Sequence, residues 1–547
     1  MRYDALPHAH SIRGSDVSRR RHYRGKRDNQ GGSTSLSTRL TRKRLLEIVG
    51  AGAGLVALTS TLGCGAKRTQ SAHARPTQAN YEVWNFRSRP DLGPPVVEMT
   101  TPARNTSPGY VFVAPKRGAL APQNGPGQNG PMILDEGGQP VWFNSLQNQG
   151  KSATDFKVQS YKGRPVLTWW EAPVLRGPSP GEYVILDDSY REITRVQAGN
   201  GYKADMHEFL ITPESTGLLT IYDHLPMDLS SVGGIEDGTV VEGIIQEIDI
   251  ETGEVLLEWH SLDHVDLEES YELDSHEFTH DTFEYFHINS IEVDHDGNLL
   301  ISAKKTSAVY KLDRNTGRII WRLGGKDSDF EMGPGTRTRH QHDARRQEDG
   351  TITIFDNHGD PQLFANGVTE DEQSRGIVLE IDEDAMTASL VREYTRPKLL
   401  GAAHEGNMQV LSNGNVFIGW GSEPNFSEFS RDGELLYDAN FVTKQQSYRA
   451  FRFPWQGQPQ DDPAVMVKPG TRNNLMLYVS WNGATEVATW EVLAGPSRNR
   501  LRTIGSVPRN GFETVITLRT SEPVVDVRAK DRSGRVLGSA RAVEPGD

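Results

Sequence analysis

Four histidines stand at the same point of a recurring sequence unit. Each begins a short apolar run, which crosses a turn containing Gly or Asn into a second apolar run: HEFLITPESTGLLTIYD from His207, HINSIEVDHDGNLLISA from His287, HDARRQEDGTITIFDN from His342 and HEGNMQVLSNGNVFIGW from His404. This pattern predicts a β-hairpin with the histidine at its head. Because hairpins repeated around an axis direct equivalent side chains toward the centre, we expect several imidazoles to converge on one pocket.

The unit that begins at His287 carries further polar groups. On an extended strand, His287 and Asn289 lie two residues apart and face the same side. The returning strand brings Lys304 near the level of this pair. A cation, an imidazole and an amide together suit a tetrahedral oxyanion such as sulfate or phosphate. The alternative is that His287 only bonds a backbone group at the start of its strand.

His342, in RHQHDARRQEDGTITIFDN, is the histidine with the widest choice of roles. An imidazole can serve as a general base, a metal ligand or a covalent nucleophile. The neighbouring Asp343 either orients the imidazole or points away into the sheet. A zinc or iron site is the less favoured reading, and it would join Asp205 and His207 to His287 and His342.

A second repeat describes the elements that must position these side chains. It consists of an apolar strand, Asp or Ser, a turn and another apolar strand, as in MILDEGGQPVWF, VILDDSYREITRV, QEIDIETGEVLLEW, VYKLDRNTGRIIWRL, VLEIDEDAMTASLVREY and SEFSRDGELLYD. One further hairpin, DFKVQSYKGRPVLTWW from Asp155, has Asp where the others have His. Four strands per unit and six units predict an all-β fold, a six-bladed β-propeller over residues 80–455.

The end of the chain differs in composition. The stretch FPWQGQPQDDPAVMVKPG, from Phe453, is polar and rich in Pro, which indicates a boundary. Beyond it, short runs alternate apolar and polar residues and include Trp481 and Trp490. We expect residues 456–547 to hold this linker and a small β-sandwich similar to a fibronectin type III module.

The first 64 residues have the pattern of an export signal. TRKRLLE, from Thr41, resembles a twin-arginine motif with Lys43 in place of the second arginine, and an Ala/Gly-rich apolar run follows. The run ends at Cys64, the only cysteine, which has the position of a lipoprotein acylation site. We therefore expect an exported protein of the cell envelope, anchored by lipid to the outer face of the membrane, with residues 65–79 as a linker. A plain cleaved signal is the alternative, because Thr61 stands where Leu is usual.

Composition limits the remaining classes of function. With 36% hydrophobic and 24% charged residues over 547 positions, the chain has enough apolar residues for one large or two ordinary cores. The net charge of -14 argues against nucleic acid or an anionic membrane surface as a partner of the folded part, because both bind clustered Lys and Arg. The oligomeric state is left open.

Residues from about 80 to 455 resemble the aryl sulfotransferase family of exported β-propeller enzymes. The strongest matches are HINSIEVDHDGNLLISAKKTSAVYKLDRNTGRIIWRLGG, RHQHDARRQEDGTITIFDN, GNMQVLSNGNVFIGWGS and SYRAFRFPW. The resemblance implies transfer of a sulfuryl group from an aryl sulfate to a phenolic acceptor through a sulfated histidine, without a cofactor or a nucleotide carrier.

The resemblance also implies roles for single residues. His342, in QHDA, would be the nucleophile; His287 and Asn289, in HIN, would bind the sulfuryl oxygens; and His207, in DMHE, would act as an acid/base or anion binder. Lys304 stands where the family has arginine, so the charge is kept but the bidentate geometry is lost. Arg339 is a second cation expected to bind substrate, and Trp169, Trp170 and Tyr222 are candidates for the wall of a phenol pocket.

Two other functions compete with the transferase. One is a propeller without catalytic activity that binds a ligand or a protein, because the same fold serves both purposes. The other is a metal-dependent hydrolase or lyase that uses the histidine cluster. Release of phenol that depends on an acceptor favours the transferase, whereas release that is lost on chelation favours the metal enzyme.

Overall fold

The computed structural model describes residues 82–118, 127–174, 181–274, 280–359, 368–470 and 474–540. The chain divides into two compact units, Met1–Arg75 and Pro76–Asp547, and all described residues belong to the second unit. The predicted export signal, its Cys64 and the 65–79 linker lie outside the described residues.

The described residues form strands and short 3-10 helices, with no α-helix among them, so the prediction of an all-β chain is confirmed. The 3-10 helices are η2 (Gln147–Gln149), η3 (Ser230–Val232), η4 (Ser261–Asp263), η5 (Leu267–Glu269), η6 (Tyr271–Asp274) and η7 (Glu370–Glu372). No helix in this part of the chain has the length and apolar character needed to cross a membrane.

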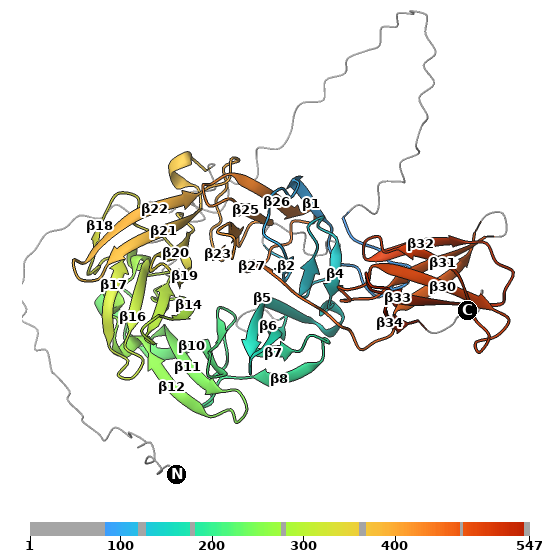
Figure 1. Ribbon diagram of the computed structural model, residues 1–547. Coiled ribbons are helices and arrows are strands. Elements are labelled where there is room, and N and C mark those ends of the chain that lie inside the picture. The colour runs from blue at the N-terminus through green and yellow to red at the C-terminus, as the bar shows by residue number, and fades with distance from the viewer. Residues whose placement is uncertain are drawn as a thin grey trace, which may run out of the picture. The chain divides into compact units, whose positions relative to one another are not determined.

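Six sheets of this described part lie around a common centre, in a propeller-like arrangement (Figure 1). Their strands are β2 (Tyr110–Val113), β3 (Met132–Leu134) and β4 (Pro140–Phe143) with β27 (Ala450–Phe453); β5 (Lys151–Tyr161), β6 (Arg164–Pro173), β7 (Glu182–Leu186) and β8 (Glu192–Val196); β9 (Phe209–Ile211), β10 (Thr216–Met227), β11 (Gly238–Asp249), β12 (Val255–His260) and β13 (Thr282–Glu284); β14 (Ile288–Val293), β15 (Leu299–Ala303), β16 (Ala308–Leu312) and β17 (Ile319–Gly324); β18 (Glu331–Met332), β19 (His342–Arg346), β20 (Ile352–Asp356), β21 (Arg375–Asp382) and β22 (Thr387–Tyr394); and β23 (Asn407–Val410), β24 (Val416–Gly419), β25 (Asn425–Phe429) and β26 (Leu435–Phe441) with β1 (Val97–Thr101).

Two of these sheets join distant parts of the chain. β27 pairs antiparallel with β2, and β1 pairs antiparallel with β26, so each sheet contains strands from both ends of the ring. β9, β14, β19 and β23 each end their sheet. They stand at or just after the four repeated histidines, as the hairpin pattern predicts.

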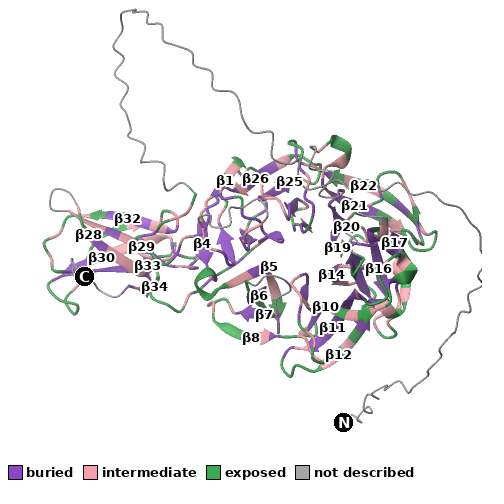
Figure 2. Ribbon diagram, turned by 180° about the vertical axis from the view of Figure 1, so that it is seen from behind, coloured by how far each residue is buried: buried purple, intermediate pink, exposed green. Residues whose placement is uncertain are grey.

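The apolar core fills the spaces between neighbouring sheets, where most strand residues are buried (Figure 2). One such cluster joins Leu218 and Ile245 of the third sheet to Ile301 and Tyr310 of the fourth. Trp169 packs against Trp142, with ring centroids 6.5 Å apart. Trp170 donates its indole N–H to the carbonyl of Ala204, 3.2 Å away. Both tryptophans therefore belong to the core, and of the three candidate wall aromatics only Tyr222 lies beside the histidines.

The described C-terminal strands form two further antiparallel sheets. One contains β28 (Ala464–Pro469), β29 (Leu475–Ser480) and β32 (Glu513–Leu518), and the other contains β30 (Thr489–Gly495), β31 (Arg502–Pro508), β33 (Val524–Lys530) and β34 (Val536–Ser539). Trp481 and Trp490 are buried in the cluster shared by the two sheets. Asn482 exchanges hydrogen bonds with the backbone of Phe143, at 2.9 and 3.0 Å, and so ties this part to β4.

Candidate active site

Two of the predicted histidines are in ring contact. The centroids of His207 and His287 lie 4.9 Å apart with the rings nearly perpendicular, and Tyr222 stacks on His207 at 5.0 Å. Tyr448, which is fully buried, lies 5.6 Å from His207. Tyr222 thus has the position expected of an aromatic wall, and Tyr448 is a second aromatic that the sequence did not single out.

His342 and Lys304 belong to the same cluster. Lys304 follows β15, is buried, and donates its backbone N–H to the carbonyl of His287 at 2.9 Å. Lys304, His287 and His207 all lie close enough to the His342 imidazole to lower its pKa. The structure therefore brings together the four residues predicted to be catalytic. Arg339 has an exposed side chain, and its backbone N–H donates to Asp356 at 2.9 Å.

The backbone at the heads of these strands differs from the prediction of an extended strand. His287 has a φ of 58°, in the left-handed region, and the register of β14 with β15 shifts between Ile288 and Ser290. Asp343 and Glu405 have φ values of 57° and 65° in the corresponding places. Left-handed non-glycine residues are costly and persist only where surrounding contacts hold them. The direction of the site side chains comes from these local distortions rather than from simple strand alternation.

Asn289 is fully buried beside the strand that carries His342. Its Nδ2 donates to the carbonyl of Gln341 at 2.9 Å, which joins β14 to the start of β19. Its Oδ1 is buried and has no hydrogen-bond partner among the described residues.

The imidazole of His342 is 1% exposed and is held at both nitrogens. Nδ1 lies 2.7 Å from Oδ1 of Asn357 and 3.1 Å from the carbonyl of His340. Nε2 accepts the backbone N–H of Glu405 at 3.2 Å. Sequence reasoning missed Asn357, although it is the final residue of the quoted motif RHQHDARRQEDGTITIFDN.

The other two imidazoles have carboxylate partners. Nδ1 of His207 contacts Asp205, and Nδ1 of His287 lies 2.8 Å from Glu284. Asp343 does not orient a histidine, because its carboxylate binds Nε of Arg345 at 2.9 Å and accepts the backbone N–H of Met408 at 3.1 Å. Of the two alternatives for Asp343, the structure therefore supports the one in which the side chain points away from the histidine, into the sheet.

Burial and neighbouring charges lower the pKa of two of the three imidazoles, those of His342 and His287. Burial lowers the pKa of His342 well below its usual 6.5, and Lys304 and His287 lower it further. Burial likewise lowers the pKa of His287 to about 4, although Glu284 opposes the shift. Burial would raise the pKa of Glu284, but His287, Lys305 and Lys304 outweigh it and hold that pKa at about 2. At neutral pH the imidazoles of His342 and His287 are therefore uncharged, beside an ionised Glu284 and the ammonium of Lys304.

A buried ion network lies directly beneath the site. Arg449, which is fully buried, contacts Asp155 at 2.9 Å and Glu208 at 3.1 Å and donates to the carbonyl of Asn289 at 2.8 Å. Asp155, the residue that replaces histidine in the fifth hairpin, also binds Lys157 at 2.7 Å. Arg449 belongs to the motif SYRAFRFPW, but the sequence predicted no role for it.

His404 differs from the other three histidines. Its side chain is exposed, and its carbonyl accepts the backbone N–H of Ser422 at 3.0 Å. The next residue, Glu405, reaches the site through its backbone N–H and binds Lys116 at 2.6 Å with its carboxylate. Lys116 also lies 5.8 Å from the centre of the Tyr448 ring, so a second cation stands close to the histidines.

The described residues contain no group of three or more His, Cys, Asp or Glu placed to hold a metal ion. Two sequence pairs have spacings known from metal sites, namely His340 with His342 and the HEFTH stretch that begins at His276. Nδ1 of His342 is directed at Asn357. Residues 275–279 lie outside the described part.

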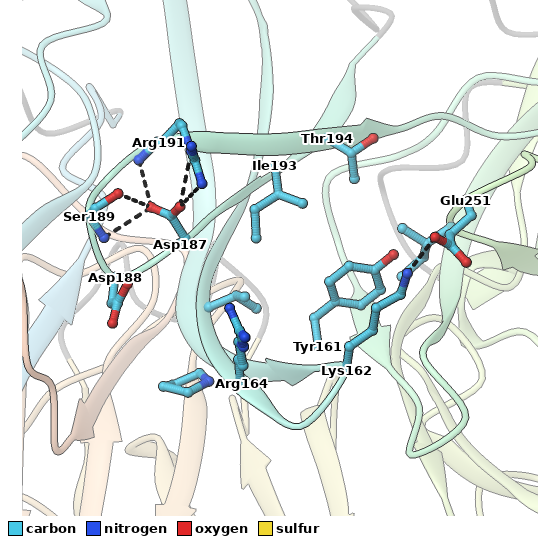
Figure 3. Close-up of a pocket in the computed structure, with 13 residues that line it drawn as sticks. Tyr161, Lys162, Arg164, Asp187, Asp188, Ser189, Arg191, Ile193, Thr194 and Glu251 are labelled. Carbon is cyan, nitrogen blue, oxygen red and sulfur yellow. Dashed lines mark hydrogen bonds and ion pairs between the residues drawn. The ribbon is translucent and has the colours of Figure 1, made fainter. Parts of the chain in front are cut away.

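A large cavity lies away from the histidines, at the turns that join β5 to β6 and β7 to β8 (Figure 3). Its volume is about 950 Å³, and Tyr161, Lys162 and Arg164 contribute to its lining. Its charged groups are largely occupied: Lys162 pairs with Glu251, and Asp187 binds the backbone and side chain of Ser189 (Figure 3). The cavity contains none of the predicted site residues.

Comparison with known families identifies the class of protein. Residues 157–442 match the arylsulfotransferase (ASST) family, and this stretch is more than half of the chain. The protein therefore belongs to that family, as the resemblance of its motifs predicted. The matched region contains His207, His287, Lys304 and His342. No curated protein matches the sequence.

Several solved structures are weakly similar to this chain. A protein of unknown function from Bacteroides caccae is 13% identical over 63% of this chain and 100% of its own, with a TM-score of 0.38. A catalytically inactive virginiamycin B lyase from Staphylococcus aureus with quinupristin is 11% identical over 70% and 94%, with a TM-score of 0.28. A putative 6-phosphogluconolactonase from Bacteroides fragilis is 11% identical over 81% and 97%, with a TM-score of 0.32.

Proposed function

We propose that the protein is an aryl sulfotransferase that carries a sulfuryl group from an aryl sulfate ester to a phenolic acceptor. The transfer uses a ping-pong mechanism with a sulfohistidine on His342 and needs no cofactor. The observation that carries the proposal is a buried, neutral His342 whose Nε2 accepts a hydrogen bond, in one cluster with Lys304 and His287. A nucleophilic imidazole must be neutral, and an oxyanion beside it needs a cation.

The remaining roles follow from the contacts. Lys304, the second N–H of Asn289 and His287 bind the sulfuryl oxygens, and His207 exchanges the phenol proton with the help of Asp205. The backbone N–H of Glu405 must leave Nε2 of His342 when sulfur approaches, because both use the same lone pair. Tyr222, stacked on His207, is the wall for the aryl ring.

The proposal extends to the fold and the location. We assign the six sheets to the blades of a closed propeller, with the pairs β27–β2 and β1–β26 as its closure, and the two C-terminal sheets to a fibronectin-like module. The assigned ranges are residues 80–455 for the propeller and residues 456–547 for the linker and the module. Residues 1–64 are assigned to an export signal that ends at a lipid-modified Cys64 on the outer face of the membrane.

The direct test is incubation of the purified protein with a chromogenic aryl sulfate, with and without a second phenol. The proposal predicts release of coloured phenol that depends on the acceptor and survives chelation. Release that needs no acceptor and is lost on chelation would replace the transferase with a metal-dependent enzyme. Absence of release with a panel of aryl sulfates would favour a binding protein.

A further inference from the structure

The three site histidines differ in what faces their Nδ1 atoms. His207 and His287 face the carboxylates of Asp205 and Glu284, whereas His342 faces the neutral amide of Asn357. We propose that Asn357 is a positioning residue: as an uncharged acceptor at Nδ1 it fixes the tautomer of His342 without the negative charge that faces the other two rings. The inference rests on the proposed sulfuryl transfer and adds a residue to it.

The orientation of the Asn357 amide is set by two backbone carbonyls. Nδ2 of Asn357 lies 2.8 Å from the carbonyl of Ala402 and 3.0 Å from that of Glu405. Carbonyl oxygens only accept hydrogen bonds, so the NH₂ group must face them. Oδ1, the acceptor, is therefore the atom that faces His342. The side chain of Asn357 is fully buried. A flipped amide would place Oδ1 against two carbonyl oxygens, which is costly in a buried position.

The amide orientation in turn determines the tautomer of His342. An acceptor at 2.7 Å requires a proton on Nδ1, and the carbonyl of His340, 3.1 Å from the same nitrogen, requires it as well. On the far side of the ring, the backbone N–H of Glu405 requires Nε2 to be an acceptor. Three partners from separate segments thus agree on one tautomer, in which the lone pair available to sulfur is on Nε2.

The neutrality of Asn357 matters in both halves of the reaction. Nε2 attacks sulfur, the S–O bond to the donor aryl group breaks, and its electron pair leaves on the phenolate oxygen, which takes a proton from the His207 imidazolium. His342 then carries the sulfuryl group on Nε2 and a proton on Nδ1, so its ring is positively charged while the attached sulfuryl group carries one negative charge. In the second half the acceptor phenol gives its proton to His207 and attacks sulfur, and the N–S electron pair returns to Nε2.

A carboxylate in place of Asn357 would favour the cationic ring in both states. It would raise the pKa of the free imidazole, because an opposite charge favours the charged form. It would also stabilise the sulfated ring and make it a poorer leaving group. Burial, Lys304, His287 and His207 lower the pKa of His342, and together they outweigh the hydrogen bond with Asn357, which raises it. Glu405 contributes its backbone N–H, and its carboxylate is paired with Lys116.

The first test reads the tautomer without any turnover. Nitrogen NMR of histidine-labelled protein is recorded at neutral pH, and the His342 signals are assigned by their loss in His342→Asn. The expected spectrum has a protonated Nδ1 and an unprotonated Nε2 that persist below pH 6.5, the ordinary pKa of histidine. An imidazolium, or a proton on Nε2, at neutral pH would overturn the proposal. This outcome is independent of whether sulfuryl transfer occurs.

The second test uses Asn357→Asp, which keeps the size of the side chain. The acid limb of kcat/KM for the donor should move to higher pH, and turnover should fall about tenfold to a hundredfold, the usual effect of losing an orienting partner of a functional histidine. With donor alone, the sulfated protein should persist longer than in the wild type.

Asn407→Asp is the matched control, because Asn407 is also fully buried and bridges the backbone of Ala450 at 2.9 Å in both directions. It should lower Tm as much as Asn357→Asp without moving the acid limb. Equal pH profiles in the two variants would reduce Asn357 to a structural role and contradict the proposal. If the wild type transfers no sulfuryl group while NMR finds the expected tautomer, the proposed function fails and the assignment of the tautomer stands.

Discussion

At the scale of single residues, the site combines neutral imidazoles with a buried cation. After burial, the charge of Lys304 lowers the pKa of His342 most, and burial lowers the pKa of His287 to about 4. A lysine ammonium supplies charge without the two-pronged geometry of arginine. The chemistry therefore depends on the position of Lys304 more than on a rigid fork of hydrogen bonds.

Replacement of Lys304 tests this dependence. Lys304→Ala should lower kcat/KM by the equivalent of about 2 to 4 kcal/mol, the range for loss of one group that stabilises an oxyanion, and Lys304→Arg should retain or improve activity. Arg339→Ala is the comparison, because Arg339 was predicted to bind substrate and its side chain is exposed. If kcat/KM falls further in Arg339→Ala than in Lys304→Ala, then Arg339 rather than Lys304 binds the sulfuryl oxygens.

The low pKa of His287 predicts how stability depends on pH. Between the ordinary pKa of 6.5 and the folded value of about 4, the unfolded chain binds a proton that the folded chain does not. The free energy of unfolding should therefore fall as the pH falls through this window, by at most about 3 kcal/mol at roughly 1.4 kcal/mol per pKa unit.

Urea unfolding at the two ends of the window, for wild type and His287→Gln, measures this contribution. The variant should lose less stability than the wild type as the pH falls. His295→Gln, at an exposed histidine, is the control for loss of an imidazole as such. Equal losses in wild type and His287→Gln would show that this imidazole takes up its proton in the folded state.

At the scale of elements, the heads of β14, β19 and β23 carry the site on distorted backbone. The loop from His404 to Gly406 packs tightly against Phe355. Gly406 has a φ of 101°, and a Cβ at this position would lie 2.3 Å from the Phe355 ring. Phe355 belongs to β20 and is fully buried, so the ring has little room to move. This loop delivers the N–H that contacts His342.

Gly406→Ala should therefore disturb both stability and chemistry. A clash with a buried ring and a left-handed φ together cost roughly 2 to 5 kcal/mol. Gly433→Ala is the control, because Gly433 has a φ of 91° with nothing within 4 Å of its would-be Cβ and should lose only about 1 to 2 kcal/mol. The measurements are Tm by thermal unfolding and turnover for both variants. Equal Tm values and full activity in both variants would show that the loop can move to accommodate a Cβ at Gly406.

The sequence predicts the features of the fold and site that depend on local patterns, and it does not predict those that depend on contacts between distant residues. The strand–turn–strand pattern is local, so the four histidines and the hairpins they head were predictable. Arg449 contacts Asp155, far away in the chain, and the partner of His342, Asn357, is placed by the pairing of two strands. The left-handed φ of His287 was likewise hidden: histidine adopts this region more often than most residues, but positive φ is uncommon for any non-glycine residue, so the sequence alone does not mark the position.

At the scale of the whole molecule, the described sheets all belong to one compact unit, Pro76–Asp547. The ring joins its ends through β27 with β2 and β1 with β26, so strands from both ends of the propeller-like part must be present before the site is complete. β-strand pairings of such long range raise the entropic cost of folding. The proposed lipid anchor at Cys64 precedes the residues that form this ring in the sequence.

The lipid anchor is tested by Cys64→Ser. Multiple acyl chains hold a protein on a membrane, whereas a protein without them is released. The variant should move from the membrane fraction to the soluble exported fraction and keep its aryl sulfotransferase activity. Mass spectrometry of the mature N-terminus checks the site. A wild-type protein that is wholly soluble and begins at another residue would contradict the anchor.

The most direct measurement for the central claim is mass spectrometry of the protein mixed with an aryl sulfate donor in the absence of acceptor, followed by peptide mapping. The account predicts one sulfuryl adduct, on His342, which disappears when a phenol is added. His342→Asn should form no adduct and transfer nothing while remaining folded, and His207 and His287 variants should be slowed without being silent. An adduct on another residue, or a fully active His342→Asn protein with sequential kinetics, would contradict the account.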